Sequence, residues 1–427
     1  MPDPRLATFL ACFACCAAGA TAEPLQLDAE AAARLARERS ELVLAARGEA
    51  AAIRSDSRVA DAFAWPALHA NARYTHIGDS PEAIDPTTGA PSQVIASDDY
   101  YRAGIELRQL LWSFGRHAAA GQRRAADTAR AQSQIELAER DIAYQARIAV
   151  EAVRLARARL GVAEDRLEQR RGELEDARER RAAGTVTDLD VRQSRLRVLA
   201  ALDQHDEAER TRRVALLDLA AAVAMDADAI AVSGELARPA TITELFTTVR
   251  ERIEAGSELR QLRAQLRAQH AAVTTNRALQ LPELYADGSW YLEGPESDDL
   301  DSGWSVGLGV QWNLYAGGAT MARREAARHR VRALRQRAIA LIRDRNRLLA
   351  QAEARAVVLA SRIERAVEAV ELAEANYQQA RSSYRAGTIT LTRLGETSLA
   401  VAEARYALVQ LVHAESVLAH DLRRLAR

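Results

Sequence analysis

The segment Ala183-Gly184-Thr185-Val186-Thr187 returns as Ala386-Gly387-Thr388-Ile389-Thr390, 203 positions further along the chain. A second pair of segments, Leu111-Trp112-Ser113-Phe114-Gly115 and Leu314-Tyr315-Ala316-Gly317-Gly318, has the same displacement. Each copy therefore keeps the same spacing of 69 positions between its two glycine anchors. Two anchors without an insertion between them indicate an internal duplication rather than a coincidence.

The copies share a further segment upstream, but with a different displacement. Trp65-Pro66-Ala67-Leu68 corresponds to Leu281-Pro282-Glu283-Leu284, which lies 216 positions later. Because 216 exceeds 203 by 13, the first copy contains 13 extra residues. We assign them to the polar stretch from Asp79 to Asp99, which is rich in Ser, Pro, Thr and Gly and whose counterpart near Gly294 is short.

The beginning of the chain has the pattern of a secretory signal peptide. Arg5 precedes an apolar run from Leu6 to Ala18, and Ala20-Thr21-Ala22 forms a small-x-small cleavage signature. All three cysteines lie inside this segment, so the mature chain is expected to have neither disulfides nor a reactive thiol. Cys12 fits a lipid attachment site poorly, because it comes too early in the apolar run. The predicted division is a signal peptide (1–22), a first repeat (23–225), a connector (226–240) and a second repeat (241–427).

Each copy is predicted to contain a helix, a strand, a loop, a strand, a very long helix, a tight turn and a last helix. The stretch from 116 to 183 has no proline and only three scattered glycines. One continuous helix on the order of 100 Å long is therefore expected, and a compact domain does not need such a helix. The predicted helices run roughly over 27–63, 116–183 and 189–224 in the first copy, and over 242–279, 319–386 and 392–426 in the second.

The last of these helices carries a heptad seam. Leu411, Leu418 and Leu425 recur every seven residues, and Leu408 and Leu422 fill the alternate steps. This spacing predicts that the long helices pair as coiled coils. A solvent-facing rod would use the same spacing, so the strands have to decide between the two interpretations.

Four predicted strands alternate between apolar and polar residues. From Leu68 to Thr75 every even position is apolar and every odd position is polar, and a similar alternation occupies 101–108, 283–293 and 304–312. Aromatic belts at a lipid boundary explain why all tryptophans lie in or beside these strands. The core of a soluble sheet does not explain the charged residues on the second face. The five tryptophans are Trp65, Trp112, Trp290, Trp304 and Trp312.

Four strands do not close a barrel. An open sheet edge in hydrocarbon leaves unpaired amides, which cost several kcal/mol each, so the chain is expected to oligomerise. Single-chain membrane barrels begin at about eight strands, so two copies would suffice and three would leave a lumen. No apolar stretch of 18 or more residues follows the signal peptide, and no helical membrane span is expected.

Composition gives little support to other kinds of function. Lys plus Arg (58) and Asp plus Glu (59) nearly cancel, so no net field attracts nucleic acid. No Ser/His/Asp, Cys/His or metal-binding cluster emerges, and histidines such as His117 and His205 are isolated on predicted helices. We therefore expect neither an enzyme nor a cofactor nor a metal site.

The duplication, the Leu-x-x-Gly-Gly strand end at Leu314 to Gly318 and the paired Gly-Thr turns together resemble the TolC-like outer-membrane efflux family. The resemblance covers essentially the whole mature chain. It implies a mixed α/β membrane protein, in which three chains each contribute four strands to a transmembrane β-barrel and continue as a long coiled-coil helical barrel in the periplasm. The implied function is the exit duct of a tripartite efflux or type I secretion system, with a periplasmic adaptor and an inner-membrane pump as partners.

A periplasmic adaptor protein is the principal alternative, because adaptors are also built on long hairpins. An adaptor has one hairpin inserted in a split β-rich domain, whereas this chain has two hairpins at a fixed displacement. A coiled-coil scaffold without a pore would leave the tryptophans unexplained. The transported substrate is not readable, because drugs, metal ions and polypeptides pass through ducts with similar walls.

In the TolC-like family the turns at the helix tips contact the adaptor and close the channel. The second tip usually carries two acidic residues one turn apart, and the matching positions here are Arg393 and Glu396. Asp190 is the repeat equivalent of Arg393, so opposite charges either link neighbouring hairpins at the entrance or simply point into water. The turns themselves are either ordinary helix ends or also adaptor contacts. The docking positions implied are Arg181, Ala182, Ala183, Gly184 and Thr185 in the first tip and Tyr384, Arg385, Ala386, Gly387 and Thr388 in the second.

Overall fold

The computed structural model describes residues 24–59, 62, 65–76, 78, 82–84, 91–93, 99–239 and 242–426. The predicted signal peptide and most of the polar stretch after Asp79 lie outside the described residues. The chain divides into two compact units, and each draws on both repeats. We name them the tip unit, which is Met1–Glu41, Glu139–Val249 and Leu349–Arg424, and the sheet unit, which is Leu42–Ala138, Arg250–Leu348 and Leu425–Arg427.

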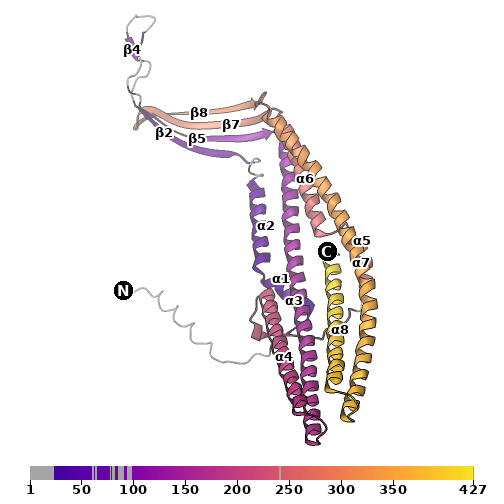
Figure 1. Cartoon of the computed structure of the whole chain (residues 1–427). Coiled ribbons are helices and arrows are strands. Elements are labelled where there is room, and N and C mark those ends of the chain that lie inside the picture. Colours follow the sequence, from indigo (N-terminus) through magenta and orange to yellow (C-terminus); the bar gives the residue numbers. More distant parts are fainter. Residues whose placement is uncertain are drawn as a thin grey trace, which may run out of the picture. The chain divides into compact units, whose positions relative to one another are not determined.

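Helices dominate the described chain (Figure 1). They are α1 (Ala29–Arg39), α2 (Glu41–Val59), α3 (Arg116–Ala182), α4 (Asp188–Val223), α5 (Ile242–Arg252), α6 (Ser257–Ala278), α7 (Ala319–Arg385) and α8 (Leu391–Leu425). The strands are β1 (Leu25–Leu27), β2 (Ala67–His76), β3 (Glu82–Ile84), β4 (Pro91–Gln93), β5 (Asp99–Trp112), β6 (Ile230–Val232), β7 (Glu283–Glu296) and β8 (Asp299–Gln311). In the described residues, no helix is both long enough and apolar enough to cross a membrane.

The long helices display the duplication directly. Helices α3 and α7 each contain 67 residues, and both their first and their last residues are 203 positions apart. Helices α4 and α8 also begin 203 positions apart, at Asp188 and Leu391. The predicted uninterrupted helix from 116 to 183 is therefore present in both copies, within one residue of its expected end.

The prediction of a single helix at the start of each copy is wrong. In the first copy the helix breaks at Ser40, which has extended backbone angles and separates α1 from α2. In the second copy Gly256, also extended, precedes α6. The two breaks are 216 positions apart, which is the displacement found upstream of the strands. The interruption is thus a duplicated feature, and it carries no proline that would have revealed it.

The connector between the repeats contains a short strand that the sequence did not predict. Strand β6 pairs in parallel with β1, and Leu27 and Val232 are buried at that pair. Both belong to the apolar core of the tip unit, together with Leu219 and Val223 of α4. The first half of the connector is therefore anchored against the first residues of the described chain.

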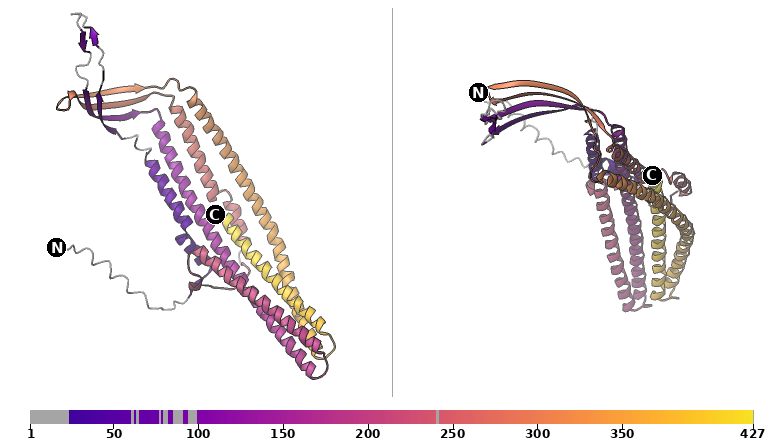
Figure 2. Two further views of the ribbon diagram at one scale, coloured as in Figure 1. Left: turned by 60° about the vertical axis from the view of Figure 1, so that its left-hand side comes forward. Right: turned by 90° about the horizontal axis from the view of Figure 1, so that it is seen from above.

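One four-stranded antiparallel sheet, in the order β2-β5-β7-β8, belongs to the sheet unit (Figure 2). Its register places apolar residues opposite one another, with Ile105 facing Trp290 and Trp290 facing Trp304. These side chains cover one face, on which Val306 is 78% and Leu308 76% exposed. The predicted alternation is present, and it leaves an apolar face that nothing in the described chain covers.

The opposite face of the sheet is polar. Asn71 donates to Glu106 at 3.1 Å, and Arg108 donates to Gln311 at 2.8 Å. The Arg102 guanidinium lies 5.1 Å from the ring centroid of Tyr291. Strands β2 and β8 are the outer strands, and among the described residues each has a neighbouring strand on one side only. The sheet therefore has two different faces and two open edges.

Adjacent residues of β8 allow the two faces to be tested separately. Val306→Arg places a charge on the apolar face, which would cost about 2–4 kcal/mol at the midplane of a bilayer. Ser305→Arg places the same charge on the polar face, where Ser305 contacts Ser289 at 2.9 Å. We expect Val306→Arg to remove the assembled protein from the membrane fraction and Ser305→Arg to leave it there. Equal recovery of both variants would contradict lipid contact at the apolar face.

Candidate functional site at the helix tips

The turn after α3 ends that helix with a left-handed glycine. Gly184 has φ +74, and its N–H donates to the carbonyl of Arg181 at 3.0 Å. The Thr185 N–H donates to the Arg180 carbonyl at 2.9 Å, and the Thr185 hydroxyl donates to the same oxygen at 2.9 Å. This is the Schellman arrangement, in which glycine adopts positive φ without the clash of a side chain. The turn after α7 repeats every one of these bonds with Gly387 (φ +81), Thr388, Ser383 and Tyr384.

The next helix starts differently in the two tips. Thr187 and Asp190 form a capping box, because the Asp190 carboxylate accepts from the Thr187 N–H at 3.0 Å and the Asp190 N–H donates to the Thr187 hydroxyl at 3.3 Å. In the second tip Arg393 occupies the position of Asp190. Its N–H donates to Thr390 at 3.3 Å, but its guanidinium donates to Glu396 at 3.0 Å. Asp190 and Arg393 are thus each engaged within their own hairpin.

The flanks of the two turns also differ. In the first tip Arg181 donates to Asp188 at 2.7 and 3.2 Å, and both side chains are exposed. The hydrogen bond from Arg181, and then its charge, lower the pKa of Asp188 below its ordinary value of 3.8. The equivalent residues of the second tip are Tyr384 and Leu391, which are 1% and 4% exposed. One tip is therefore closed by an ion pair and the other by apolar packing.

Arg180 connects the two tips. Its guanidinium donates to the backbone carbonyl of Tyr384 at 2.7 Å and lies 4.6 Å from the centroid of the Tyr384 ring. A Cβ at Gly387 would be 3.3 Å from a terminal nitrogen of Arg180. Burial raises the pKa of the Tyr384 hydroxyl, so the ring meets the guanidinium in its neutral form.

Asp176 makes a second connection, one turn further up α3. Its carboxylate accepts from Arg381 at 3.1 Å and from Arg385 at 3.0 and 2.8 Å, and Asp176 is only 5% exposed. The hydrogen bonds from Arg385 to Asp176 raise the pKa of Arg385 above its ordinary value. The repeat equivalent of Asp176 is Gln379, which is exposed. The first hairpin therefore supplies the acid and the second hairpin the two bases.

A buried ion pair lies in α3 on the N-terminal side of Asp176. Arg170 donates to Glu173 at 2.6 Å, and the two side chains are 6% and 1% exposed. Burial, followed by the charge of Glu173, raises the pKa of Tyr377 to about 12. Arg170 also donates to the backbone carbonyl of Gly395 in α8 at 3.4 Å. This buried ion pair therefore joins α3 to α8, and so the first hairpin to the second.

Sequence reasoning found the turns but not the residues that connect them. Of the ten predicted docking residues nine are exposed, and only Tyr384 is buried. Asp176, Arg180 and Arg381 were missed, because no single-copy motif marks them. Divergence between the copies marks two of them, because Asp176 corresponds to Gln379 and Arg180 to Ser383. Arg381 corresponds to another arginine, Arg178, and only the structure identifies it. In the described residues, no group of three or more His, Cys, Asp or Glu is arranged to hold a metal ion.

Solved structures share this fold over nearly the whole chain. A membrane protein from Pseudomonas aeruginosa has a TM-score of 0.79 at 19% identity, with 96% of this chain and 98% of that chain covered. The outer membrane protein VceC from Vibrio cholerae has a TM-score of 0.78 at 18% identity, with 93% and 96% covered. CusC has a TM-score of 0.78 at 15% identity, with 96% and 94% covered. The chain therefore has the same fold of strands and long helical hairpins as these proteins.

The sequence comparison identifies the family. Residues 249–426, which form most of the second repeat, match the family model described as outer membrane efflux protein. Among curated proteins, none matches this chain. This match in the second repeat and the shared fold of the whole chain confirm the predicted resemblance to the outer membrane efflux protein family. The predicted fold class, the outer-membrane location with periplasmic helices and the role as an exit duct are confirmed, and the adaptor alternative is not favoured.

The tip glycines offer a test of the turn geometry. A β-branched residue in the left-handed region costs at least roughly 1–2 kcal/mol, whereas asparagine is tolerated there. We expect Gly184→Val to raise the rate of limited proteolysis at the tip by about tenfold, and Gly184→Asn to change it little. Gly387→Val should have a larger effect, because its side chain also meets Arg180. Identical cleavage rates for the Val and Asn variants would contradict a strained turn.

Proposed function

We propose that three copies of the chain assemble into one duct, in which the sheets close a β-barrel in the outer membrane. The observation that carries this proposal is the four-stranded sheet, which has one exposed apolar face and two outer strands without a second neighbour in the part of the chain that the structure describes. In hydrocarbon those strand edges need partners, and other copies of the same sheet supply them. A duct of this kind conducts solutes and has no catalytic step to perform.

The division into repeats remains part of the proposal. Export would remove residues 1–22, and the repeats 23–225 and 241–427 would place two hairpins per chain at the periplasmic end. Three chains would then present six tips around one axis. A periplasmic adaptor, itself linked to an inner-membrane pump, would contact the exposed residues of both turns, namely Arg181 to Thr185 and Arg385 to Thr388.

The proposal assigns the resting, closed state to contacts between the two hairpins of one chain. Asp176 accepts from Arg381 and Arg385, and Arg180 holds the second turn by its carbonyl. In each of these hydrogen bonds the donor is a charged guanidinium, and in two of them the acceptor is a carboxylate. Such bonds are stronger than bonds between neutral groups and have defined directions. Opening would separate the hairpins and break these bonds together. An adaptor that binds the exposed turn residues could stabilise the separated arrangement.

A wild-type measurement tests the proposed function as a whole. The purified mature protein should be a trimer in detergent and should insert into planar bilayers with discrete conductance steps, because its strand edges exclude a membrane-embedded monomer. The single-channel recordings should show a mostly closed state at rest. A monodisperse monomer that stays soluble without detergent would exclude the proposal.

Asp176→Asn tests the contact between hairpins. Both arginines keep their charge but lose the carboxylate, and because their side chains are 31% and 57% exposed we expect a loss of about 1–2 kcal/mol rather than the full value for a buried pair. The open probability in planar bilayers should rise about tenfold. Gln379→Asn, the same shortening of the repeat equivalent on an exposed position, is the matched control and should behave as wild type. Unchanged gating in Asp176→Asn would remove this contact from the mechanism.

Asp190, Arg393 and Glu396 are proposed to form a charged ring at the aperture. In three copies the repeat-equivalent Asp190 and Arg393 would alternate in sign, and each exposed pair would contribute about 0.2–1 kcal/mol to closure. Glu396 lies 3.0 Å from Arg393 and would hold it in place. Because Asp190 also completes a capping box, its replacement removes a helix cap as well as a charge.

Four variants separate these two effects. Asp190→Arg should raise resting conductance, Arg393→Asp should do the same, and the combination of both should restore closure. Thr187→Ala removes the cap but keeps the charge of Asp190, so it should lower stability by about 1 kcal/mol without changing conductance. If Thr187→Ala raises the resting conductance as much as Asp190→Arg does, the helix cap and not the charge ring controls the aperture.

A further inference from the structure

A pocket of about 440 Å³ lies in the sheet unit, where β5 passes into α3. Helices α2, α3 and α6 contribute to its lining, as does the end of β5. Its volume falls in the range of pockets that hold drug-sized molecules. Neither the tip contacts nor the sheet faces described above use this pocket.

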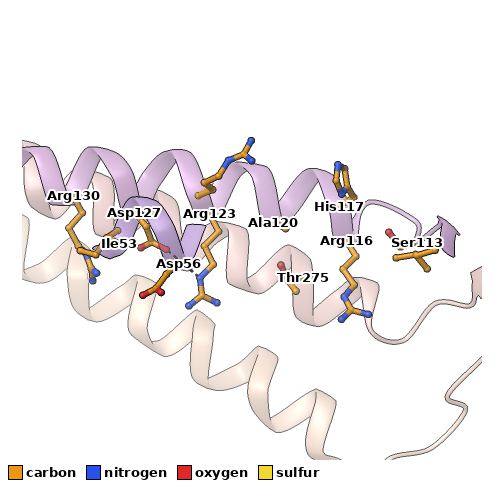
Figure 3. Close-up of a pocket in the computed structure, with 12 residues that line it drawn as sticks. Ile53, Asp56, Ser113, Arg116, His117, Ala120, Arg123, Asp127, Arg130 and Thr275 are labelled. Atoms are coloured by element: carbon orange, nitrogen blue, oxygen red, sulfur yellow. Dashed lines mark ion pairs between the residues drawn. The ribbon is translucent and has the colours of Figure 1, made fainter. Parts of the chain in front are cut away.

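Three arginines at intervals of seven dominate one wall. Figure 3 shows Arg116, Arg123 and Arg130 extending to the same side of α3. Residues seven apart lie on one face of a helix, so the three guanidinium groups form a row. Their repeat equivalents in α7 are Ala319, Ala326 and Ala333. The row therefore exists in one copy only, and the pairing of long helices does not require it.

Two members of the row, Arg123 and Arg130, keep donors for which the described residues supply no hydrogen-bond partner. Arg116 forms an ion pair with Glu283, and the Nε of Arg123 lies 3.6 Å from an oxygen of Asp127, which is longer than a hydrogen bond. The Nε of Arg130 is buried and has no hydrogen-bond partner in the described residues. Asp56 is the other carboxylate of the lining. A planar guanidinium carries five donors, so Arg123 and Arg130 together can bind an anion in a forked arrangement.

The surroundings of the pocket strengthen its preference for anions. Within the sheet unit, α7 carries ten arginines and two carboxylates between Ala319 and Leu348. Among the described residues, no carboxylate pairs with the exposed side chains of Arg323, Arg330 or Arg337. An excess of one charge raises the local concentration of the opposite ion.

The rest of the wall is apolar. Ile53, Leu110 and Ala120 line the pocket beside the arginines. A second hollow of about 430 Å³ shares Leu110 with it and is lined by Trp112 and Phe114, whose rings meet edge to face at 6.2 Å. Both aromatic side chains are more than 40% exposed. The row of arginines thus adjoins a surface on which an apolar group can lie.

We propose that this pocket binds an anionic amphiphile, with its phosphate, sulfonate or carboxylate on Arg123 and Arg130 and its apolar body against Ile53, Leu110 and Trp112. Two sources supply such a molecule: a phospholipid of the surrounding membrane, or an acidic amphiphilic solute that passes through the duct. The assignment rests on the sheet unit alone. It does not depend on the trimer, on the adaptor or on the closure of the tips.

Binding of decyl phosphate to the purified wild-type protein tests the assignment, with decyl maltoside as the uncharged probe of equal chain length. Titration calorimetry in amphipol below the micelle concentration should give saturable binding of decyl phosphate, at least about tenfold tighter than decyl maltoside, since one charge-assisted hydrogen bond contributes about that factor. Inorganic phosphate should compete only weakly, because it lacks the apolar body. Equal affinity for the two amphiphiles would overturn the proposal, as would inorganic phosphate binding as tightly as decyl phosphate.

Matched variants locate the site. Arg123→Gln with Arg130→Gln should weaken decyl phosphate binding about 100-fold, or tenfold for each lost charged contact. The control is Arg330→Gln with Arg337→Gln, which removes two arginines at the same spacing from α7 outside the pocket lining. This control reduces only the general attraction of anions, which salt screens, so it should weaken binding by no more than about twofold. Arg123→Lys with Arg130→Lys keeps the charge and should lose only part of the affinity. If the Gln pair fails to fold, the Lys pair decides: full wild-type affinity in the Lys pair, or equal weakening by the α7 control, would overturn the site.

The last arm separates the two sources. Native mass spectrometry of the protein released from nanodiscs that contain phosphatidylglycerol and phosphatidylcholine should show retained phosphatidylglycerol if a membrane lipid is the ligand. Loss of that lipid in the Gln pair, with retention in the α7 control, would assign the pocket to the membrane. Retention of neither lipid, together with wild-type binding of decyl phosphate, would assign it to a transported solute. Lipid retained equally in wild type and in the Gln pair, with no effect on decyl phosphate, would overturn both assignments.

Discussion

Every backbone N–H and C=O group of a strand needs a partner, and in hydrocarbon only another strand can provide it. The sheet of this chain meets that requirement internally for β5 and β7 but leaves β2 and β8 with a neighbour on one side each. Removing the exposed apolar side chains of Val306 and Leu308 from water is favourable, so this face of the sheet favours an apolar environment. In such an environment water is not available to bond the free strand edges. Oligomerisation is therefore a consequence of the strand edges. The same constraint explains how one chain can contain only four of these strands, which are too few to close a barrel, because other copies of the chain supply the rest. The long helices satisfy their own backbone groups and need not enter the membrane.

The duplication provides the second strand pair, and later divergence gives the copies different tasks. Both turns keep the glycine and the threonine, because the left-handed helix end depends on them. Around that common frame the charges differ: Asp176 faces two arginines of the other hairpin, while its own repeat equivalent is the exposed Gln379. A contact between two identical hairpins would need self-complementary side chains. Divergent copies can instead place an acid on one hairpin and bases on the other, which gives the contact both strength and direction.

Periodicity predicted the parts of this molecule in which one local pattern determines the structure. The strand alternation at 68–75 and 304–312 and the proline-free stretch from 116 to 183 led to the correct elements, since neither depends on a distant partner. The break at Ser40 carries no proline or glycine that would have marked it. The pairing of β6 with β1 and the position of Asp176 depend on packing between segments far apart in sequence, and no local pattern specifies them. The buried position of Tyr384 was missed for the same reason. From the sequence, a tyrosine beside a turn is expected to be exposed. In the structure the guanidinium of Arg180, from the other hairpin, lies over the ring of Tyr384.

The net charge of this chain excludes a global field but says nothing about local ones. Over the whole chain the charges cancel, with 58 basic and 59 acidic residues, and the chain contains no lysine. Within α7, however, the stretch from 319 to 348 has ten arginines against two carboxylates, whereas the stretch from 349 to 385 has five of each. Charges in solution are screened over about 8 Å at physiological salt, and a helix of 67 residues is on the order of 100 Å long. Opposite charges placed that far apart do not neutralise one another. Each section of such a helix acts with its own sign, so the basic section can attract anions although the chain as a whole is nearly neutral.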